Sequence, residues 1–175
     1  MENNEAVETV RGWFSGRLPG EWFEGDPEIV VDREEITVIG GLRPPAFGEG
    51  VSEVERAAAV EGGVLRFREE TRERRMEIAH EAERRFRRKV SWGVAVGEEK
   101  VMFTTLSVPV MTRLRQSERR VLDTLVAAGV ARSRSEALAW CVRLVGDHTD
   151  TWLADLRDAL RHVDRVRAAG PGANS

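Results

Sequence analysis

The sequence has a single cysteine, no tyrosine and no long apolar run. One cysteine, Cys141, cannot form an internal disulfide framework or a multi-cysteine zinc site. No apolar stretch approaches the roughly 18 residues that a membrane-spanning helix needs. The acidic start MENNEAVETV also lacks the basic-then-apolar pattern of a signal peptide. We therefore expect a cytoplasmic protein that has no membrane partner.

Motifs for catalysis and cofactor binding are also scarce. The sequence has no glycine-rich phosphate loop and no pair of histidines at zinc-binding spacing, and no Ser-His-Asp arrangement can be placed on it. His148 and His162 are too far apart to share one helical metal face, and His80 stands alone among charged residues. We expect neither an enzymatic activity nor a cofactor nor a bound metal.

Charge is distributed unevenly along the chain. Residues 1–110 contain 16 Lys/Arg against 22 Asp/Glu, a net charge of −6, whereas residues 111–175 contain 11 against 8, a net charge of +3. An acidic part followed by a basic part indicates two functions or two partners. We expect the acidic part to bind a protein partner or to assist oligomerisation.

Apolar periodicity predicts a small α+β domain with a mainly antiparallel sheet over residues 1–108. Residues 43–63 are rich in proline and glycine and are expected to form a loop with a helical turn or two at 54–59. The predicted order is helix, hairpin, helix, hairpin: a first helix within 5–18, strands at 29–31 and 36–39, a long helix at 65–90, and strands at 91–96 and 100–106.

The end of the long predicted helix is strongly basic. Two interpretations of these cations remain open. They are typical of a solvated face that also complements the helix dipole, and they could instead form a secondary phosphate-binding patch. The residues of this basic patch are Arg84, Arg85, Arg87, Arg88 and Lys89.

Residues 110–146, VMTRLRQSERRVLDTLVAAGVARSRSEALAWCVRLVG, have three features in order. A short alternating strand at 110–115 comes first, a helix that begins near Ser117 comes second, and a helix with a Ser133–Glu136 capping box comes third. A strand and two helices of this size cannot bury both apolar faces alone. The pattern therefore predicts a symmetric dimer with paired strands.

This order, with RLR before one helix and RSRSEAL at the next, resembles the ribbon-helix-helix family of DNA-binding proteins over residues 109–147. The resemblance implies a β-ribbon that enters the major groove of DNA. It also implies that outward strand residues read bases, and that the start of the second of these two helices holds a phosphate. The implied base-reading residues are Met111, Arg113 and Arg115, and the implied phosphate-binding residues are Arg132, Ser133, Arg134 and Ser135.

The remaining sequence predicts one more helix. An apolar stripe that begins after Thr149 or Asp150 indicates a helix within 148–169, and residues 170–175, GPGANS, are expected to be disordered.

Two functions are consistent with these features. The first is a homodimeric DNA-binding protein, a bacterial-type transcriptional regulator or a nucleoid-associated protein. The alternative is a non-enzymatic dimeric scaffold, in which the segment 109–147 only dimerises and the basic patch or the N-terminal sheet recognises a partner.

Overall fold

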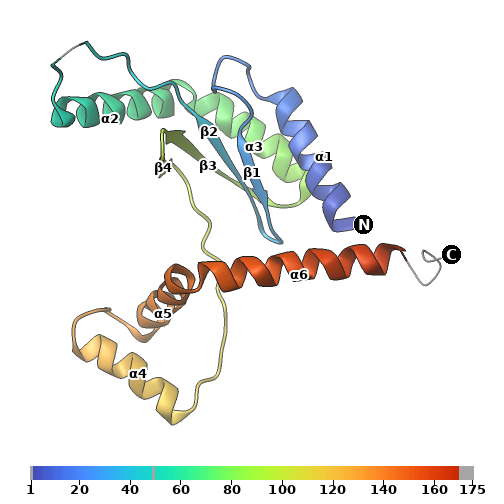
Figure 1. Cartoon of the computed structure of the whole chain (residues 1–175), viewed down its shortest axis with the longest axis vertical. Helices are drawn as coiled ribbons and strands as arrows, with labels where there is room; N and C mark the ends of the chain where they lie inside the picture. The colour runs from blue at the N-terminus through green and yellow to red at the C-terminus, as the bar shows by residue number, and fades with distance from the viewer. Residues whose placement is uncertain (1, 49, 170–175) are drawn as a thin grey trace. The chain divides into compact units, whose positions relative to one another are not determined.

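The structure is a computed structural model that describes residues 2–48 and 50–169 (Figure 1). The chain divides into two compact units, Glu2–Pro109 and Val110–Ser175, and each is described by itself. The elements in chain order are α1 (Glu2–Arg17), β1 (Glu28–Val31), β2 (Glu35–Gly41), α2 (Glu53–Glu70), α3 (Arg72–Phe86), β3 (Lys89–Val96), β4 (Glu99–Met102), α4 (Gln116–Ala127), α5 (Arg134–His148) and α6 (Asp150–Ala169).

The N-terminal unit contains one mixed sheet with the strand order β1-β2-β3-β4. Both predicted hairpins are confirmed, since β1 pairs with β2 and β3 pairs with β4 in antiparallel register. The central pairing of β2 with β3 is parallel, with Ile36 opposite Val90. The sequence did not predict this parallel pairing, because the pattern within each hairpin does not specify how two hairpins join. A parallel join needs a crossover, which α2 and α3 supply.

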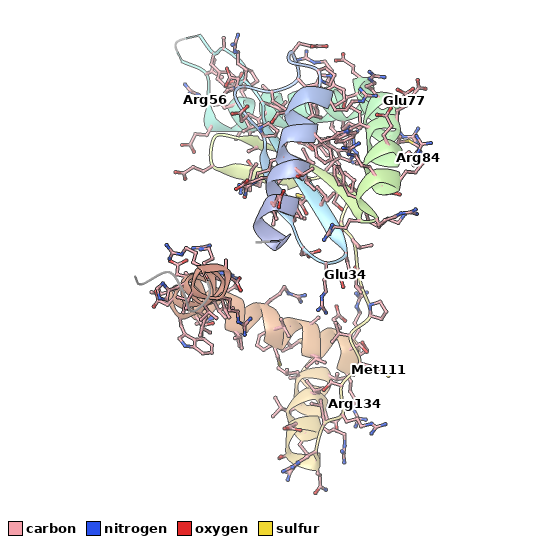
Figure 2. The ribbon with its side chains drawn as sticks, turned by 90° about the vertical axis from the view of Figure 1, so that its right-hand side faces the viewer. Glu34, Arg56, Glu77, Arg84, Met111 and Arg134 are labelled. Carbon is pink, nitrogen blue, oxygen red and sulfur yellow. The ribbon has the colours of Figure 1, made fainter. Side chains whose placement is uncertain are left out.

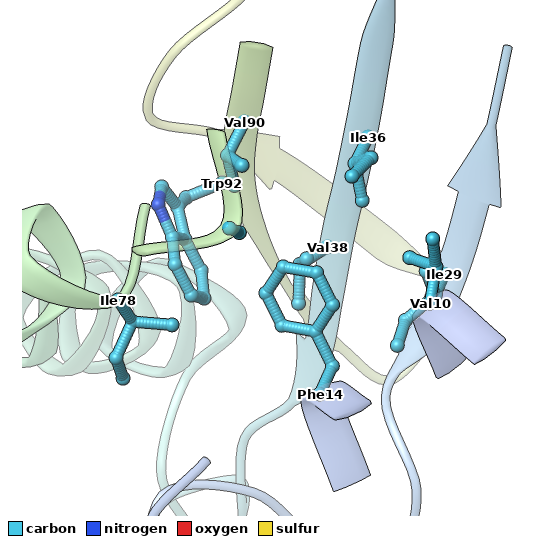
Figure 3. Packing of buried hydrophobic residues seen from close by; sticks show 9 residues of the cluster. Val10, Phe14, Ile29, Ile36, Val38, Ile78, Val90 and Trp92 are labelled. Carbon is cyan, nitrogen blue, oxygen red and sulfur yellow. The ribbon is translucent and has the colours of Figure 1, made fainter. Parts of the chain in front are cut away.

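The hydrophobic core lies between one face of this sheet and the helices α1 and α3 (Figure 3). Alternate residues of β2 and β3 point to that face because side chains in a strand alternate between its two faces. Phe14 of α1 and Ile78 of α3 are fully buried against them. The strand residues that they meet are Ile29, Ile36, Val38, Val90 and Trp92.

A chain of aromatic contacts extends the core toward α2. The ring centroids are 4.9 Å apart for Trp13–Phe14 and 6.4 Å apart for Trp22–Trp92. Gly40 makes room for part of this cluster, because the Phe23 ring lies 2.0 Å from the position that a Cβ would occupy. The other rings in the network are Phe67, Phe86 and Phe103.

The prediction of one long helix over 65–90 is wrong, because two helices meet at Thr71 and the chain enters β3 at Lys89. The Thr71 hydroxyl donates to the Phe67 carbonyl at 2.6 Å and accepts from Arg75 Nε at 2.9 Å. A threonine that bonds back to the preceding turn bends a helix without glycine or proline. The predicted loop at 43–63 also ends early, because a capping box at Ser52 begins α2.

The C-terminal unit contains three helices, and the predicted last helix is confirmed as α6. The buried core of the C-terminal unit consists of Leu122, Ala131 and Ala137. Five partly buried apolar side chains pack against this core. The last predicted segment, the tail at 170–175, lies outside the described residues.

The expected ribbon-helix-helix unit is not formed. Residues 104–115 have no regular secondary structure, so the predicted strand at 110–115 is absent, although α4 and α5 follow it. A strand requires a neighbouring strand for its backbone hydrogen bonds, and this segment has none in the described chain. Within the described ranges, no helix is both long and apolar enough to cross a lipid bilayer.

Candidate nucleic-acid interface

The densest positive charge of the C-terminal unit lies at the start of α4, in the sequence RLRQSERR. We call Arg113, Arg115, Arg119 and Arg120 the arginine cluster. All four side chains are exposed, and Glu118 is the one acidic residue among residues 113–120. Eight consecutive residues therefore carry a net charge of +3.

The arginine cluster makes no direct ion pair within the described chain. Among the side chains described at 5–48 and 50–168, no carboxylate lies within ion-pair distance of these four guanidinium groups. At longer range, the charge of Arg119 contributes to lowering the pKa of the Asp123 carboxyl. Arg119 Nη1 donates to the Leu114 carbonyl at 2.7 Å. The Glu118 carboxylate accepts from the Arg115 backbone amide rather than from an arginine side chain.

The position of the cluster is unfavourable for α4 itself. The helix dipole places partial positive charge at the N-terminus, where anions are stabilising and cations are not. Arg115 is the N-cap residue, and Arg119 follows one turn later. The helix dipole therefore does not account for arginines at this position, and a phosphate group would satisfy both the dipole and the guanidinium groups.

The three residues predicted to read bases are accessible. Met111 is 101% exposed, and Arg113 and Arg115 are exposed as well. Figure 2 shows Met111 on the extended chain that leads into α4. Because residues 110–115 do not form a strand, no pleat fixes an alternating orientation for the three side chains.

The start of α5 is built as a capped helix end. Ser133 is the N-cap, and its hydroxyl accepts from the Glu136 amide at 3.2 Å, as the capping box predicts. The return bond differs from the prediction, because Glu136 accepts from the Arg132 amide at 2.8 Å rather than from that of Ser133. The Arg132 guanidinium also bonds Glu136, and this contact lowers the pKa of the Glu136 carboxyl.

Arg134 is engaged in a second ion pair. Its Nε and Nη2 donate to the two Asp123 carboxylate oxygens at 2.6 Å and 2.8 Å, a bidentate contact that joins α5 to α4. This hydrogen bonding lowers the pKa of the Asp123 carboxyl. Both cations among the four predicted phosphate-binding residues, Arg132 and Arg134, are therefore partly neutralised. The other two, Ser133 and Ser135, are uncharged.

The basic patch at the end of α3 is only partly free. Lys89 pairs with Glu83 at 2.9 Å, and Arg88 Nε donates to the Asp32 carbonyl at 2.6 Å. Arg85 lies over the Phe86 ring. Arg84 and Arg87 make no side-chain hydrogen bond or ion pair within the described part of the N-terminal unit, and Figure 2 shows Arg84 on α3.

Arg87 has an unusual backbone conformation. It is the C-cap of α3 in the left-handed region, with φ of 57° and ψ of 34°. It is the one residue other than glycine with positive φ in the described ranges. Glycine is the usual residue at such a helix end, because a side chain there costs energy.

The sequence analysis missed Arg119 and Arg120 as candidate binding residues. The signal was present in the density of arginine across residues 113–120. Alternation and helix capping, which pointed to residues 110–115 and 132–135, do not detect arginines in the first turns of a helix. No group of three or more His, Cys, Asp or Glu side chains that could hold a metal ion occurs in the described chain.

Comparison with known proteins defines the family. Residues 8–102 match the family described as "Rv1265-like protein, N-terminal domain". The chain belongs to the Rv1265-like family. Residues 115–167 of this family member match the "Mb1296 C-terminal domain". This second match overturns the resemblance to the ribbon-helix-helix family, since it covers the helices on which that resemblance rested.

Named relatives of this Rv1265-like chain occur in mycobacteria. The chain is 62% identical over 162 residues to the uncharacterized protein Mb1296 of Mycobacterium bovis. It has the same identity to the uncharacterized proteins Rv1265 and MT1303 of two Mycobacterium tuberculosis strains. Each alignment covers 91% of this chain and 69% of the relative. No solved structure matches the chain.

Proposed function

We propose that this Rv1265-like protein is a homodimeric DNA-binding protein, a transcriptional regulator or nucleoid-associated protein, that holds the phosphate backbone with its arginine cluster. The observation that carries the proposal is the group of four exposed arginines at the start of α4 that make no direct ion pair with a described carboxylate. This proposal does not require a β-ribbon.

Phosphate binding suits the chemistry of the arginine cluster. A guanidinium group can donate two parallel hydrogen bonds to one phosphate. Each phosphate that is neutralised releases condensed counterions, and this release supplies most of the affinity for DNA at low salt. Arginines already paired with carboxylates gain less, since the new contact must replace an existing one. We therefore assign the main contacts to Arg113, Arg115, Arg119 and Arg120, and lesser ones to Arg132 and Arg134.

A second copy of the chain is the proposed partner of the C-terminal unit. The helices α5 and α6 expose apolar side chains to solvent, among them Val142 at 66% and Leu160 at 63%. A three-helix unit of about 60 residues buries only about 60% of the surface that its unfolded chain exposes, so its stability alone is marginal. Dimerisation would bury these faces and double the number of cluster arginines. The exposed apolar residues are Val142, Leu144, Val145, Trp152, Leu156, Leu160, Val163 and Val166.

The test is DNA binding by variants of single arginines. Arg113→Gln and Arg120→Gln are each expected to weaken binding to a fluorescent duplex about threefold to thirtyfold at roughly 50 mM salt, where phosphate contacts are least screened. Fluorescence anisotropy measures the dissociation constants. Arg157→Gln, at an exposed arginine of α6 outside the cluster, is the matched control and is expected to bind like the parent.

Two results would contradict the proposal. One is the absence of binding by the parent protein to any duplex at low salt. The other is equal weakening by the control and the cluster variants, which would show a dependence on net charge alone.

A second candidate function is supported by Arg87. A non-glycine residue in a left-handed conformation is the kind of backbone strain that clusters at functional sites, which favours a role for the Arg87 side chain. In this alternative the C-terminal helices only dimerise, and the basic patch binds an acidic partner. It predicts that Arg87→Glu abolishes partner binding, whereas Arg113→Glu has no effect.

A further inference from the structure

A groove with a largely apolar lining lies between α2 and β4 in the N-terminal unit. Its volume is about 710 Å³, within the usual range for small-molecule sites. Figure 1 shows α2 passing beside the end of β4. Leu65 and Met102 are 47% and 37% exposed along this groove. The other apolar residues that line it are Val54, Ala57, Ala58, Val60, Val64, Val101 and Phe103.

Arg75, a largely buried cation without a described counterion, does not itself line the groove but lies over the ring of Phe103, which does. Arg75 is 6% exposed, and no carboxylate of the described chain lies within ion-pair distance of it. Its Nε donates to Thr71 Oγ1 and its Nη2 to the Arg68 carbonyl at 2.7 Å. Nη1 has no hydrogen-bond partner among the described residues and is the atom open to solvent, because no fully buried side-chain nitrogen or oxygen of these residues lacks a partner. Buried charged side chains are normally paired, because desolvation of an isolated charge is costly.

Arg68 brings a second cation to the same place. The guanidinium carbons of Arg75 and Arg68 lie 4.9 Å and 5.8 Å from the centroid of the Phe103 ring. Burial lowers the pKa of Arg75, and the positive charge of Arg68 lowers it further. Two cations therefore repel each other around one aromatic ring, and an anion between them would relieve this repulsion. Arg68 and Phe103 both line the groove.

We propose that this groove binds a long-chain carboxylate, with the carboxyl group held by Arg68 and Arg75 and the alkyl chain lying along α2 toward Val54. This inference is independent of DNA binding, since it concerns the other unit. The apolar lining matches an alkyl chain, and the two guanidinium groups match a single negative headgroup.

The carboxylates that line the rest of the groove favour one orientation of the ligand. Glu61 lines the groove two helical turns before Arg68, which corresponds to about 10 Å along α2. Glu99 lines it at the other end of β4 from Phe103. These carboxylates would repel a carboxylate headgroup, so the headgroup is expected beside Arg68 and Arg75.

Isothermal titration calorimetry with sodium dodecanoate, below its micelle concentration and with the full chain, tests this proposal. We expect one dodecanoate per chain. Arg68→Gln is expected to weaken binding at least about tenfold, because it removes a charge-assisted hydrogen bond. Arg68 is exposed, so the fold does not depend on it. Arg66→Gln, an exposed arginine on another face of α2, is the matched control and is expected to bind like the parent.

Two further ligands separate headgroup recognition from general apolar adsorption. Octanoate is expected to bind more weakly than dodecanoate, since each buried methylene strengthens binding by up to about fourfold. Dodecyltrimethylammonium, which has the same chain and a positive headgroup, is expected not to bind. Absence of dodecanoate binding, equal affinity for the cationic amphiphile, or equal affinity of the Arg68→Gln variant would each overturn the proposal.

Discussion

Ion pairing separates the arginines of the C-terminal unit into two groups. Arg132 and Arg134 donate to Glu136 and Asp123, whereas the arginine cluster makes no direct ion pair with a described carboxylate. All of these arginines fall in the basic part of the sequence, but the sequence could not show which were neutralised. Asp123 lies eleven residues from Arg134, and only the packing of α4 against α5 brings them together.

The Asp123 carboxyl gives a pH-dependent prediction. Its pKa is lowered in the folded state by the hydrogen bonds from Arg134. The contact therefore contributes stability above the ordinary carboxyl pKa of about 3.9, and this contribution is lost as the pH falls through the lowered folded value. Arg134→Gln is expected to raise the pKa of Asp123 toward the ordinary range, as followed by carboxyl-carbon NMR titration, while the charge of Arg119 still lowers it. Arg132→Gln should instead raise the pKa of Glu136. An unchanged Asp123 titration in the Arg134 variant would contradict the assignment.

Arg87 gives a prediction in which stability and binding move in opposite directions. Arg87→Gly is expected to stabilise the fold by about 0.5–1 kcal/mol, because relief of the left-handed conformation outweighs the added flexibility of glycine. Urea unfolding measures this difference. If the basic patch binds a partner, the same variant binds it more weakly. Arg84→Gly, within α3, is the control and is expected to destabilise, since glycine is unfavourable inside a helix. Destabilisation by Arg87→Gly would refute the inferred strain.

The junction between α2 and α3 shows how one side chain can set the boundary of two elements. The Thr71 hydroxyl bonds both the Phe67 carbonyl and Arg75 Nε. Thr71→Ala is expected to lower the free energy of unfolding by about 1–3 kcal/mol, because buried Arg75 loses a partner. Thr71→Ser keeps the hydroxyl and is expected to lose less. Chemical denaturation distinguishes the two variants, and equal losses would assign the effect to the methyl group instead.

Local patterns predicted some elements and not others. Alternating apolar residues identified both hairpins, and a cap followed by an apolar stripe identified α6. The pattern gave no sign of the break at Thr71, since neither glycine nor proline marks it. Gly62 and Gly63 suggested a loop, yet both lie inside α2, because the capping box at Ser52 and burial of Val64 outweigh their low helix propensity.

The alternation of residues 110–115 predicted a strand, but alternation alone does not supply a neighbouring strand. The segment VMTRLR has the required pattern, and its backbone has no pairing partner in the described chain. The match of residues 115–167 to the Mb1296 C-terminal domain places this region outside the family that the pattern resembled.

The proposed dimer gives a prediction for the assembled protein. Leu160→Asp is expected to convert the dimer to a monomer while α6 remains helical, because Leu160 is 63% exposed in the single chain. Sedimentation velocity measures the mass, and circular dichroism checks the helix content. His162→Asp, which places the same charge on another face of α6, is the control and is expected to remain dimeric. A parent protein that sediments as a monomer would refute the proposed association.

The salt dependence of DNA affinity is the measurement on which the proposed function most depends. Binding of one duplex is measured from about 50 to 200 mM salt for the parent and for the double variant Arg113→Gln/Arg120→Gln. The parent is expected to show a steep linear fall of log affinity against log salt. The double variant is expected to show a slope shallower by about 0.9 for each phosphate contact that is lost. Identical slopes for the two proteins would show that the arginine cluster does not contact the phosphate backbone.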